Sequence, residues 1–364
     1  MKIELSIGMP SNPRTWALLD SHVAPQGIDL VPSVIHPSEL FWRQLRFGDL
    51  YVSEMSFSSV IISLSKGDDR WVGLPIFTTR RFFHTGMFVR RDSGIEAPAN
   101  LKRKRVGVPE YQQTAALWNR GILQHEFDVS PPEMEFWMER VPDHSHGGAT
   151  GFTPPPGVAI HQIPPEKSIG SMMLSGELDA ALHYVLDNNL VDRSTVDLAS
   201  HPDIKPLFPD PIAEGARYYA KTGIYPINHC MAMKRPIADK HPWAILNLLK
   251  AFDAANDIAE KQRLEHVDYH LRIGLLVAGC RGRAQNPHRA PWHQGQPHGA
   301  RGRRAIFPRA GPHRPPRRAR RGFCAQHAGS INRFSQANHH NPDRKQRLQS
   351  SHPVRLKALM SSRT

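Results

Sequence analysis

Two groups of arginines in this chain could bind a carboxylate. Arg80 and Arg81 are neighbours at the end of a predicted strand, and Arg14 lies in the loop after the first predicted strand. A guanidinium group presents a planar fork of N–H donors that matches a carboxylate, so we predict that these residues bind substrate. Adjacent side chains on a strand point to opposite faces, so one of the pair could be solvated instead. Arg14 could likewise have only a surface role.

Three residues could transfer protons. His84 and His229 stand on predicted strands that cross between two halves of the fold, where they would line a cleft. Imidazole suits this work because it titrates near neutral pH. Glu54 lies among small residues after a strand and could be a general base or the partner of a helix N-terminus. We predict catalytic roles for all three, with a structural role as the alternative for each histidine.

A predicted helix start supplies further candidates. Glu110, Tyr111 and Thr114 stand where a strand-like segment gives way to a helix-like one. The free N–H groups of a helix start can receive an anion, and the ring of Tyr111 could stack on an aromatic substrate or hydrogen-bond it. We predict substrate contacts for all three residues.

His144 and His146 lie in a segment rich in proline, glycine and histidine, residues 142–156. Two imidazoles at this spacing, without a nearby third ligand, are a weak zinc signal. We therefore predict no metal and assign both histidines to substrate binding. A segment of this length without a hydrophobic period is either a functional cleft loop or a disordered excursion.

Strand-like and helix-like segments alternate through the first 276 residues, which predicts an α/β fold with a largely parallel sheet. The predicted strands span residues 3–7, 27–34, 50–52, 104–109 and 133–141; the predicted helices begin at residue 15 or span 37–47, 114–124 and 168–175. Apolar segments 83–90 and 224–233 are predicted crossover strands between lobes. A long helix over 242–263 should return to the first lobe.

Two short segments resemble copies of one unit. Gly48-Asp49-Leu50 and Gly176-Glu177-Leu178 each follow a predicted helix and precede a predicted strand. A glycine at the first position can take the left-handed conformation that ends a helix. The shared order of elements around the two copies predicts two similar α/β lobes.

Five segments carry a resemblance to a known family: residues 52–56 (VSEMS), 79–84 (TRRFFH), 106–111 (VGVPEY), 144–157 and 223–229 (GIYPINH). They resemble the 4,5-dihydroxyphthalate decarboxylases of phthalate degradation, which have a bilobal fold of the type II periplasmic-binding-protein kind. The resemblance implies a first lobe of residues 1–82 and 226–276 and a second of residues 83–225. Within the last segment we add Tyr225 and Asn228 to the predicted substrate contacts.

The resemblance also implies a reaction. One carboxylate would be lost from an aromatic diacid with two hydroxyls, giving a dihydroxybenzoate and CO2. Each carboxylate is para to a hydroxyl, so deprotonating that phenol pushes electron density to the carbon that must be protonated, and no cofactor is required. The expected partner is a small aromatic dicarboxylate. A solute-binding protein for a small carboxylate would have the same fold and is the alternative; whether the chain forms a homo-oligomer is left open.

The C-terminal segment differs in composition from the rest. Residues 271–364 hold 20 of the 47 Lys and Arg and a single acid, Asp343, whereas residues 1–270 hold the other 27 basic and 32 acidic residues. One interpretation is a basic arm that binds nucleic acid. We favour a frameshift close to Leu276, because the codons of residues 293–301, 306–313 and 320–331, moved by one base, can encode strings that resemble the family's C-terminal segment. Residues 277–364 would then be an aberrant, disordered tail that binds no nucleic acid.

The start of the chain and its cysteines bear on the compartment. Residues 1–7 lack the apolar run of a signal peptide, and no stretch of the chain approaches the ~20 apolar residues of a membrane span. Of the three cysteines only Cys230 precedes the basic segment, so no disulfide framework is expected. We expect a cytoplasmic protein that does not bind membranes.

Overall fold

The computed structural model describes residues 2–187 and 189–276, and the predicted tail lies outside these ranges. The chain divides into two compact units, of which the first takes in the described residues up to Arg263 and the second begins at Leu264. All strands and the site described below belong to the first unit. In the second unit, the described part is the end of a long helix and the turn that follows it.

The first sheet combines strands from the two ends of the described chain. It contains β1 (Ile3–Met9), β2 (Ile28–Val34), β3 (Val52–Ser56), β4 (Trp71–Gly73), β5 (Thr79–Arg80) and β12 (Ile227–Lys234). The order is β2-β1-β3-β12-β4, with β5 also paired to β12. Strands β1, β2 and β3 are parallel, and β12 is antiparallel to its neighbours.

The second sheet repeats this order. It contains β6 (Phe88–Arg90), β7 (Arg105–Val108), β8 (Glu135–Met138), β9 (Ala159–Gln162), β10 (Ala180–Ala181) and β11 (Ile204–Pro206), arranged β11-β6-β10-β7-β8-β9. Strands β7, β8 and β10 are parallel, and β6 runs against β10 as β12 runs against β3. Apart from the additional strands β5 in the first sheet and β9 in the second, the two sheets have one topology, which confirms the prediction of two similar α/β lobes.

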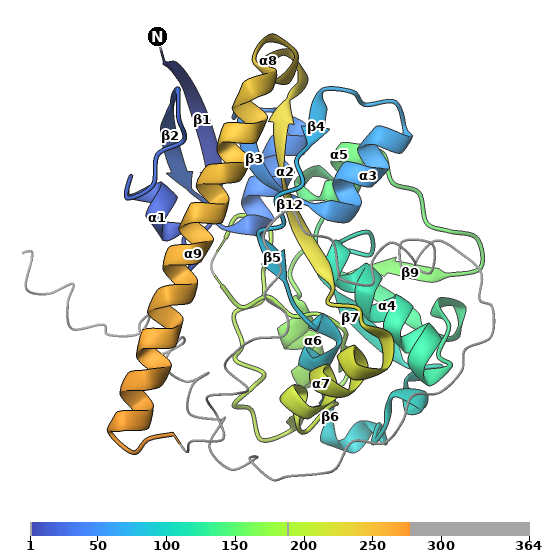
Figure 1. Cartoon of the computed structure of the whole chain (residues 1–364). Coiled ribbons are helices and arrows are strands. Elements are labelled where there is room, and N and C mark those ends of the chain that lie inside the picture. Colours follow the sequence, from blue (N-terminus) through green and yellow to red (C-terminus); the bar gives the residue numbers. More distant parts are fainter. Residues whose placement is uncertain (1, 188, 277–364) are drawn as a thin grey trace, which may run out of the picture. The chain divides into compact units, whose positions relative to one another are not determined.

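Alternation of side chains explains why helices cover both faces of the first sheet. Leu5, Ile7 and Met9 of β1 pack on one face with α1 (Trp16–Leu19), α8 (Arg235–Lys240) and α9 (Pro242–Arg272). Met55 and Cys230 pack on the other face with α2 (Pro37–Arg46) and α3 (Phe57–Ser65). Figure 1 shows α9 (orange) running along the sheet. Burying each large apolar side chain stabilises the fold by about 1.5–3 kcal/mol.

The second sheet is covered in the same way. One face packs on α4 (Thr114–Phe127), and the other packs on α6 (Ile169–Ser175). The remaining helical segments are α5 (His146–Thr150), α7 (Pro211–Thr222) and the 3-10 turns η1 (Phe83–Gly86), η2 (Arg91–Ser93), η3 (Pro98–Leu101), η4 (Pro131–Glu133) and η5 (Pro142–His144). Segment 142–156 was expected to be either a cleft loop or a disordered excursion. Its first part instead forms η5 and α5, and α5 contacts α2 of the first lobe.

The repeated glycine units lie at equivalent places in the two sheets. Gly48 ends α2 with φ +65° before β3, and Gly176 ends α6 with φ +78° before β10. In the first sheet β3 lies between β1 and β12, and in the second sheet β10 lies between β7 and β6. The predicted left-handed cap at Gly48 is confirmed.

Three predicted elements need correction. The strand placed at residues 50–52 lies at Val52–Ser56, so Glu54 is inside a strand rather than after it. The helix whose N-terminus was expected beside Glu54 begins only at Phe57. Residues 83–90 are not one crossover strand but the turn η1 followed by β6. Aromatic side chains made that segment strand-like by composition, whereas in the fold Phe83 packs edge-on against His183 and Phe88 against Tyr184.

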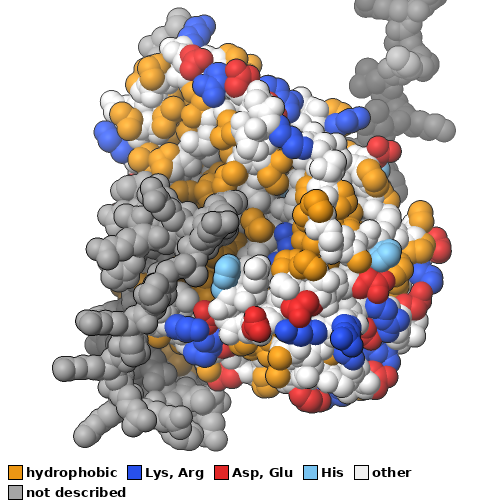
Figure 2. Space-filling model, turned by 90° about the vertical axis from the view of Figure 1, so that its right-hand side faces the viewer, with side chains coloured by type: hydrophobic (Ala, Val, Ile, Leu, Met, Phe, Trp, Pro, Cys, Tyr) orange, Lys and Arg blue, Asp and Glu red, His pale blue; other side chains and the backbone are white. Residues whose placement is uncertain are grey.

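No helix in the described part of the chain combines the length and the apolar character that a membrane crossing needs. On the face drawn in Figure 2, the described acidic and basic side chains are interspersed rather than gathered by sign. This matches the nearly balanced charge of residues 1–270.

Candidate active site

A carboxylate and a histidine form the centre of the site. Glu54 Oε1 lies 2.6 Å from His229 Nδ1, and Thr79 Oγ1 donates to the same oxygen at 3.4 Å. Glu54 is fully buried, whereas 14% of the His229 side chain is exposed. Because an ionised carboxylate can only accept hydrogen bonds, His229 Nδ1 carries a proton and donates it. The arrangement leaves Nε2 as the ring nitrogen that can accept a proton.

Two buried side-chain oxygens have no hydrogen-bond partner within the described residues: Oε2 of Glu54 itself and Oδ1 of Asn228, the residue before His229. The Asn228 side-chain nitrogen lies 2.7 Å from His229 Nε2 and donates to it. An unpaired polar atom in a buried position costs about 1–3 kcal/mol, so these oxygens mark a place where a ligand with hydroxyl or amide donors would be stabilised.

Sheet topology brings this pair together with the second lobe. His229, near the start of β12, lies opposite Ser56, at the carboxyl end of parallel strand β3. Ser56 Oγ lies 2.8 Å from Thr114 Oγ1 of the second lobe, and Arg140 of the second lobe donates to Ser38 Oγ at 2.7 Å. Open α/β sheets bind ligands at the carboxyl ends of their strands, and these bonds join two such edges.

A buried polar network flanks the pair, and its members Arg140 and Asp192 were not predicted from the sequence. Arg140, fully buried, donates to both carboxylate oxygens of Asp192 at 2.7 and 3.0 Å and lies 3.4 Å from Glu110 Oε2. Burial opposes ionisation of Asp192, but Arg140 holds the pKa of Asp192 below its ordinary value. The position of Arg140 just beyond the carboxyl end of β8 was the one signal that could have identified it.

Of the predicted residues Glu110, His144 and His146, the structure brings Glu110 and His146 together and places His144 apart. Glu110 accepts from the backbone N–H groups of His146, at 3.1 Å, and of Gly147. Burial lowers the pKa of His146 to about 4, so its ring is neutral near pH 7. His144 is exposed and packs edge-on against Trp42, with ring centroids 5.0 Å apart. His146 therefore lies in the buried network, whereas His144 lies at the surface.

Arg14, Arg80 and Tyr225 form a second predicted group. The Tyr225 hydroxyl donates to the Arg80 carbonyl at 3.0 Å, and Arg14 Nε donates to Asn256 of α9 at 2.9 Å. The pKa of Arg14 is lowered to about 10, mainly by burial; Tyr225 opposes this change and Arg80 adds to it. Burial also raises the pKa of Tyr225, although both arginines oppose this. The structure thus brings these three residues together.

Arg81 lies in a different environment from Arg80. The Arg81 guanidinium carbon is 5.5 Å from the ring centroid of Phe83, and His183 packs edge-on against the same ring at 5.3 Å. His183 follows strand β10 and was not predicted as a site residue. Its position at the carboxyl end of a strand is, as for Arg140, the signal that could have identified it.

Tyr111 and Thr114 are engaged within the protein. Tyr111 is only 5% exposed, and the guanidinium carbon of Arg120 lies 3.6 Å from its ring centroid. Thr114 Oγ1 accepts from the backbone N–H of Ser58 at 2.9 Å, so a second-lobe hydroxyl binds the first turn of α3. Both side chains help to hold the lobes and their cores, and their predicted substrate contacts stay predictions.

His84 is placed apart from Glu54 and His229. It lies in η1, fully buried, with Nε2 3.1 Å from Glu214 Oε1 of α7. The rings of Phe208 and Tyr218 lie 5.6 and 5.3 Å from it. Burial lowers the pKa of His84 even though Glu214 raises it.

Comparison with known proteins identifies the family. No family model matches the chain. A 4,5-dihydroxyphthalate decarboxylase of Comamonas testosteroni is 32% identical over 258 residues, which cover 71% of this chain and 76% of that protein. A protein of the same name from Pseudomonas putida is 29% identical over 218 residues, covering 60% and 82%. The chain belongs to the 4,5-dihydroxyphthalate decarboxylase family. The resemblance carried by the five sequence segments is confirmed, and the family is one of carboxy-lyases.

Solved structures similar to this decarboxylase-family chain have the fold of periplasmic binding proteins. The aliphatic sulphonate binding protein SsuA from Escherichia coli has a TM-score of 0.44 and 15% identity, with 80% of this chain and 85% of that chain covered. The desulfurization enzyme DSZB has a TM-score of 0.35 and 15% identity, with 74% and 78% covered. The bilobal fold expected for the family is the one found here, with one strand order in both lobes.

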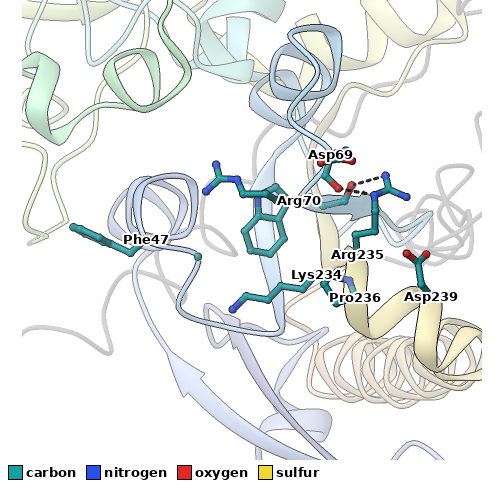
Figure 3. A pocket seen from close by; sticks show the side chains of 9 residues that line it. Phe47, Asp69, Arg70, Lys234, Arg235, Pro236 and Asp239 are labelled. Carbon is teal, nitrogen blue, oxygen red and sulfur yellow. Dashed lines mark hydrogen bonds between the residues drawn. The ribbon is translucent and has the colours of Figure 1, made fainter.

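A surface pocket at the far end of β12 is separate from the decarboxylase-family site. It is lined by Phe47, Gly48, Asp69, Arg70, Trp71, Lys234, Arg235, Pro236 and Asp239 (Figure 3). Arg235 donates to the Asp69 carbonyl at 2.5 Å, and Arg70 is paired with Asp68 at 2.8 Å. Lys234 is five residues beyond His229 on one strand, a separation of about 16 Å. The pocket is therefore not continuous with the Glu54–His229 pair.

In the part of the chain that the structure describes, no three His, Cys, Asp or Glu side chains are grouped so that they could hold a metal ion. His144 and His146, the pair considered from the sequence, have different surroundings, one exposed and one buried.

Proposed function

We propose that this protein removes one carboxylate from 4,5-dihydroxyphthalate, or a close dihydroxy aromatic diacid, to give a dihydroxybenzoate and CO2. The observation that carries the proposal is the 32% identity to the Comamonas testosteroni 4,5-dihydroxyphthalate decarboxylase over 258 residues. The buried Glu54–His229 pair supports it, because a histidine held by a carboxylate is suited to removing a phenol proton.

In the proposed reaction His229 Nε2 accepts the proton of the hydroxyl para to the leaving carboxylate. The substrate hydroxyl would take the place of the Asn228 amide, whose nitrogen lies 2.7 Å from His229 Nε2. Glu54 holds the Nδ1 proton and stabilises the imidazolium that forms. The phenolate then delocalises electrons to the carbon that bears the leaving carboxylate.

Protonation of that carbon precedes cleavage of the carbon–carbon bond. One proton is taken up by the ring for each CO2 released, and the electron pair of the broken bond restores the aromatic ring. Because the phenolate itself supplies the electrons, the reaction needs no redox partner and no electron-accepting cofactor. The histidine proton returns to the product hydroxyl.

The proposal is tested by incubating the full chain with 4,5-dihydroxyphthalate and measuring dihydroxybenzoate by chromatography and CO2 by gas analysis. We expect the two products in equal amounts, and a matched His22→Gln control, altered at an exposed histidine, should retain the rate. Tight binding of the diacid without either product would contradict the proposal and favour a solute-binding protein.

We further propose that the chain carries a frameshift close to Leu276 and acts in the cytoplasm in phthalate degradation. The support is the abrupt change in composition, from near charge balance in residues 1–270 to 20 basic residues against one acid in residues 271–364. Resequencing the gene across codons 270–285 tests the frameshift. An uninterrupted reading frame there would contradict it.

A further inference from the structure

His183 is fixed at the carboxyl end of β10 by its preceding residue. The backbone N–H of Leu182 donates to the Gly107 carbonyl at 2.9 Å, and the Leu182 carbonyl accepts from the side-chain amide of Asn119. With both polar backbone groups of Leu182 bonded, the chain direction at His183 is set by the second sheet. The imidazole therefore projects from a rigid element rather than from a free loop.

The ring of His183 has an aromatic neighbour and no hydrogen bond to the residues that the structure describes. It packs edge-on against Phe83, with ring centroids 5.3 Å apart, and is partly exposed. Among the described residues, neither ring nitrogen of His183 has a hydrogen-bond partner. The exposed Arg81, whose guanidinium carbon is 5.5 Å from the same Phe83 ring, has no ion-pair partner there either.

Burial and nearby charges keep the ring of His183 neutral. Burial is the main cause, and the positive charges of Arg81, Arg140 and His229 act in the same direction. Asp192 opposes them, and the net effect lowers the pKa of His183 to about 3. Near pH 7 the ring has one N–H donor and one acceptor nitrogen and adds no second cation beside Arg81. A cation with an adjacent neutral donor suits a single carboxylate.

We propose that Arg81 and His183 bind the carboxylate that the substrate keeps, with the ring of Phe83 beside the aromatic ring of the substrate. This inference rests on the proposed decarboxylation and assigns the two carboxylates of the diacid to different places. The departing carboxylate loses its charge as it becomes CO2, so a cation held against it would stabilise the ground state and slow the reaction.

The retained carboxylate keeps its charge throughout the reaction. Arg81 and His183 would then bind substrate and transition state equally, which lowers KM without changing kcat. This gives the assignment a kinetic signature that differs from that of the Glu54–His229 pair, where the loss should fall on kcat.

The test uses the full chain with His183→Leu, His183→Gln and Arg81→Gln, compared with a matched His161→Leu control. His161 lies on β9 of the same sheet, with 45% of its side chain exposed. Kinetics with 4,5-dihydroxyphthalate give KM and kcat, and calorimetry with phthalate, a diacid that lacks the hydroxyls, gives affinity without turnover. We expect His183→Leu and Arg81→Gln each to raise KM and weaken phthalate binding by about 10–100-fold, with kcat within about threefold.

His183→Gln keeps a neutral donor and should recover most of the affinity, and His161→Leu should change nothing. Unchanged KM and phthalate affinity in both His183→Leu and Arg81→Gln would overturn the assignment, as would a fall confined to kcat. If His183→Leu does not fold, Arg81→Gln at its exposed site decides the question alone. Phthalate binding that depends on these residues, without CO2 release from the dihydroxy substrate, would support the carboxylate site while rejecting the proposed function.

Discussion

Two histidine–glutamate pairs in this protein share residue types but differ in their surroundings. His84 Nε2 lies 3.1 Å from Glu214, and His229 Nδ1 lies 2.6 Å from Glu54. The His84 ring is enclosed by aromatic side chains, and Glu214 is also held by Arg217 at 2.6 Å. In the other pair, one carboxylate oxygen is buried without a described partner, and the histidine is partly exposed.

This difference shows which features distinguish a reactive pair from a structural one. Glu214 is satisfied by an arginine and fixes α7 against η1; among the described residues the unpartnered atom of this pair is His84 Nδ1, in a ring with no exposed surface. The Glu54–His229 pair instead has unsatisfied oxygens at an edge where the two lobes meet. Residue type identified both histidines as catalytic candidates, and only their environments separate them.

The largest expected effect comes from removing the reactive imidazole. His229→Gln should lower kcat for decarboxylation by roughly 10²–10⁴-fold, because a positioned general base contributes about that much. The variant should fold, since glutamine can still hydrogen-bond Glu54. Steady-state kinetics with a thermal melt as the folding control measures this, and activity within about threefold of the unaltered chain would rule His229 out as the base.

Arg140 and Asp192 form a third buried pair, in which both carboxylate oxygens accept hydrogen bonds. Arg140→Leu should destabilise the fold by about 3–5 kcal/mol, because it leaves the Asp192 carboxylate buried without its partner. Arg140→Lys should also destabilise it, since an ammonium group cannot reproduce the two-point contact. Urea unfolding measures both variants; a loss below 1 kcal/mol for Arg140→Leu would show that water reaches this network.

The buried histidine of that network predicts how stability depends on pH. The pKa of His146 is lowered to about 4 in the folded protein, so the unfolded chain binds more protons at this residue below pH 6.5. Stability should therefore fall as the pH drops from about 6.5 to 4, by about 3 kcal/mol from this residue. His146→Asn should flatten the profile measured by urea unfolding, whereas an exposed His22→Asn control should not. An unchanged slope in His146→Asn would contradict the assignment.

The smallest effect is expected for the enclosed pair. His84→Gln should cost about 1–2 kcal/mol of stability, because glutamine can still hydrogen-bond Glu214 but loses the ring contacts with Phe208 and Tyr218, and it should leave kcat within about threefold. Thermal unfolding and steady-state kinetics on one preparation measure both quantities. A kcat loss as large as that of His229→Gln would remove the distinction between the two pairs.

Much of the fold was predictable because its signals are local. The apolar alternation of β1 and the capped, amphipathic α2 lie within short windows of sequence, and both elements occur where predicted. Strands of three residues, such as β4 and β11, were missed because so short a segment has no measurable period. The glycine repeat succeeded because a left-handed cap favours glycine.

The site was predictable only in part. Glu54 and His229 were chosen by residue type, but their contact joins positions 175 apart and depends on the β3–β12 register. Arg140 and His183 gave no motif, since each acquires its environment from strands and helices distant in the chain. His84 is the opposite case: its residue type suited catalysis, but its burial among aromatic rings, which the sequence did not show, does not.

The most direct test of the account compares the two glutamates. Glu54→Gln and Glu214→Gln make the same chemical change, and kcat/KM for 4,5-dihydroxyphthalate should be measured for both in parallel. We predict that Glu54→Gln loses at least about 100-fold, because the imidazolium formed on His229 is no longer stabilised, and that Glu214→Gln stays within about threefold. Equal losses in the two variants, or a larger loss in Glu214→Gln, would contradict the assignment of the active site to the Glu54–His229 pair.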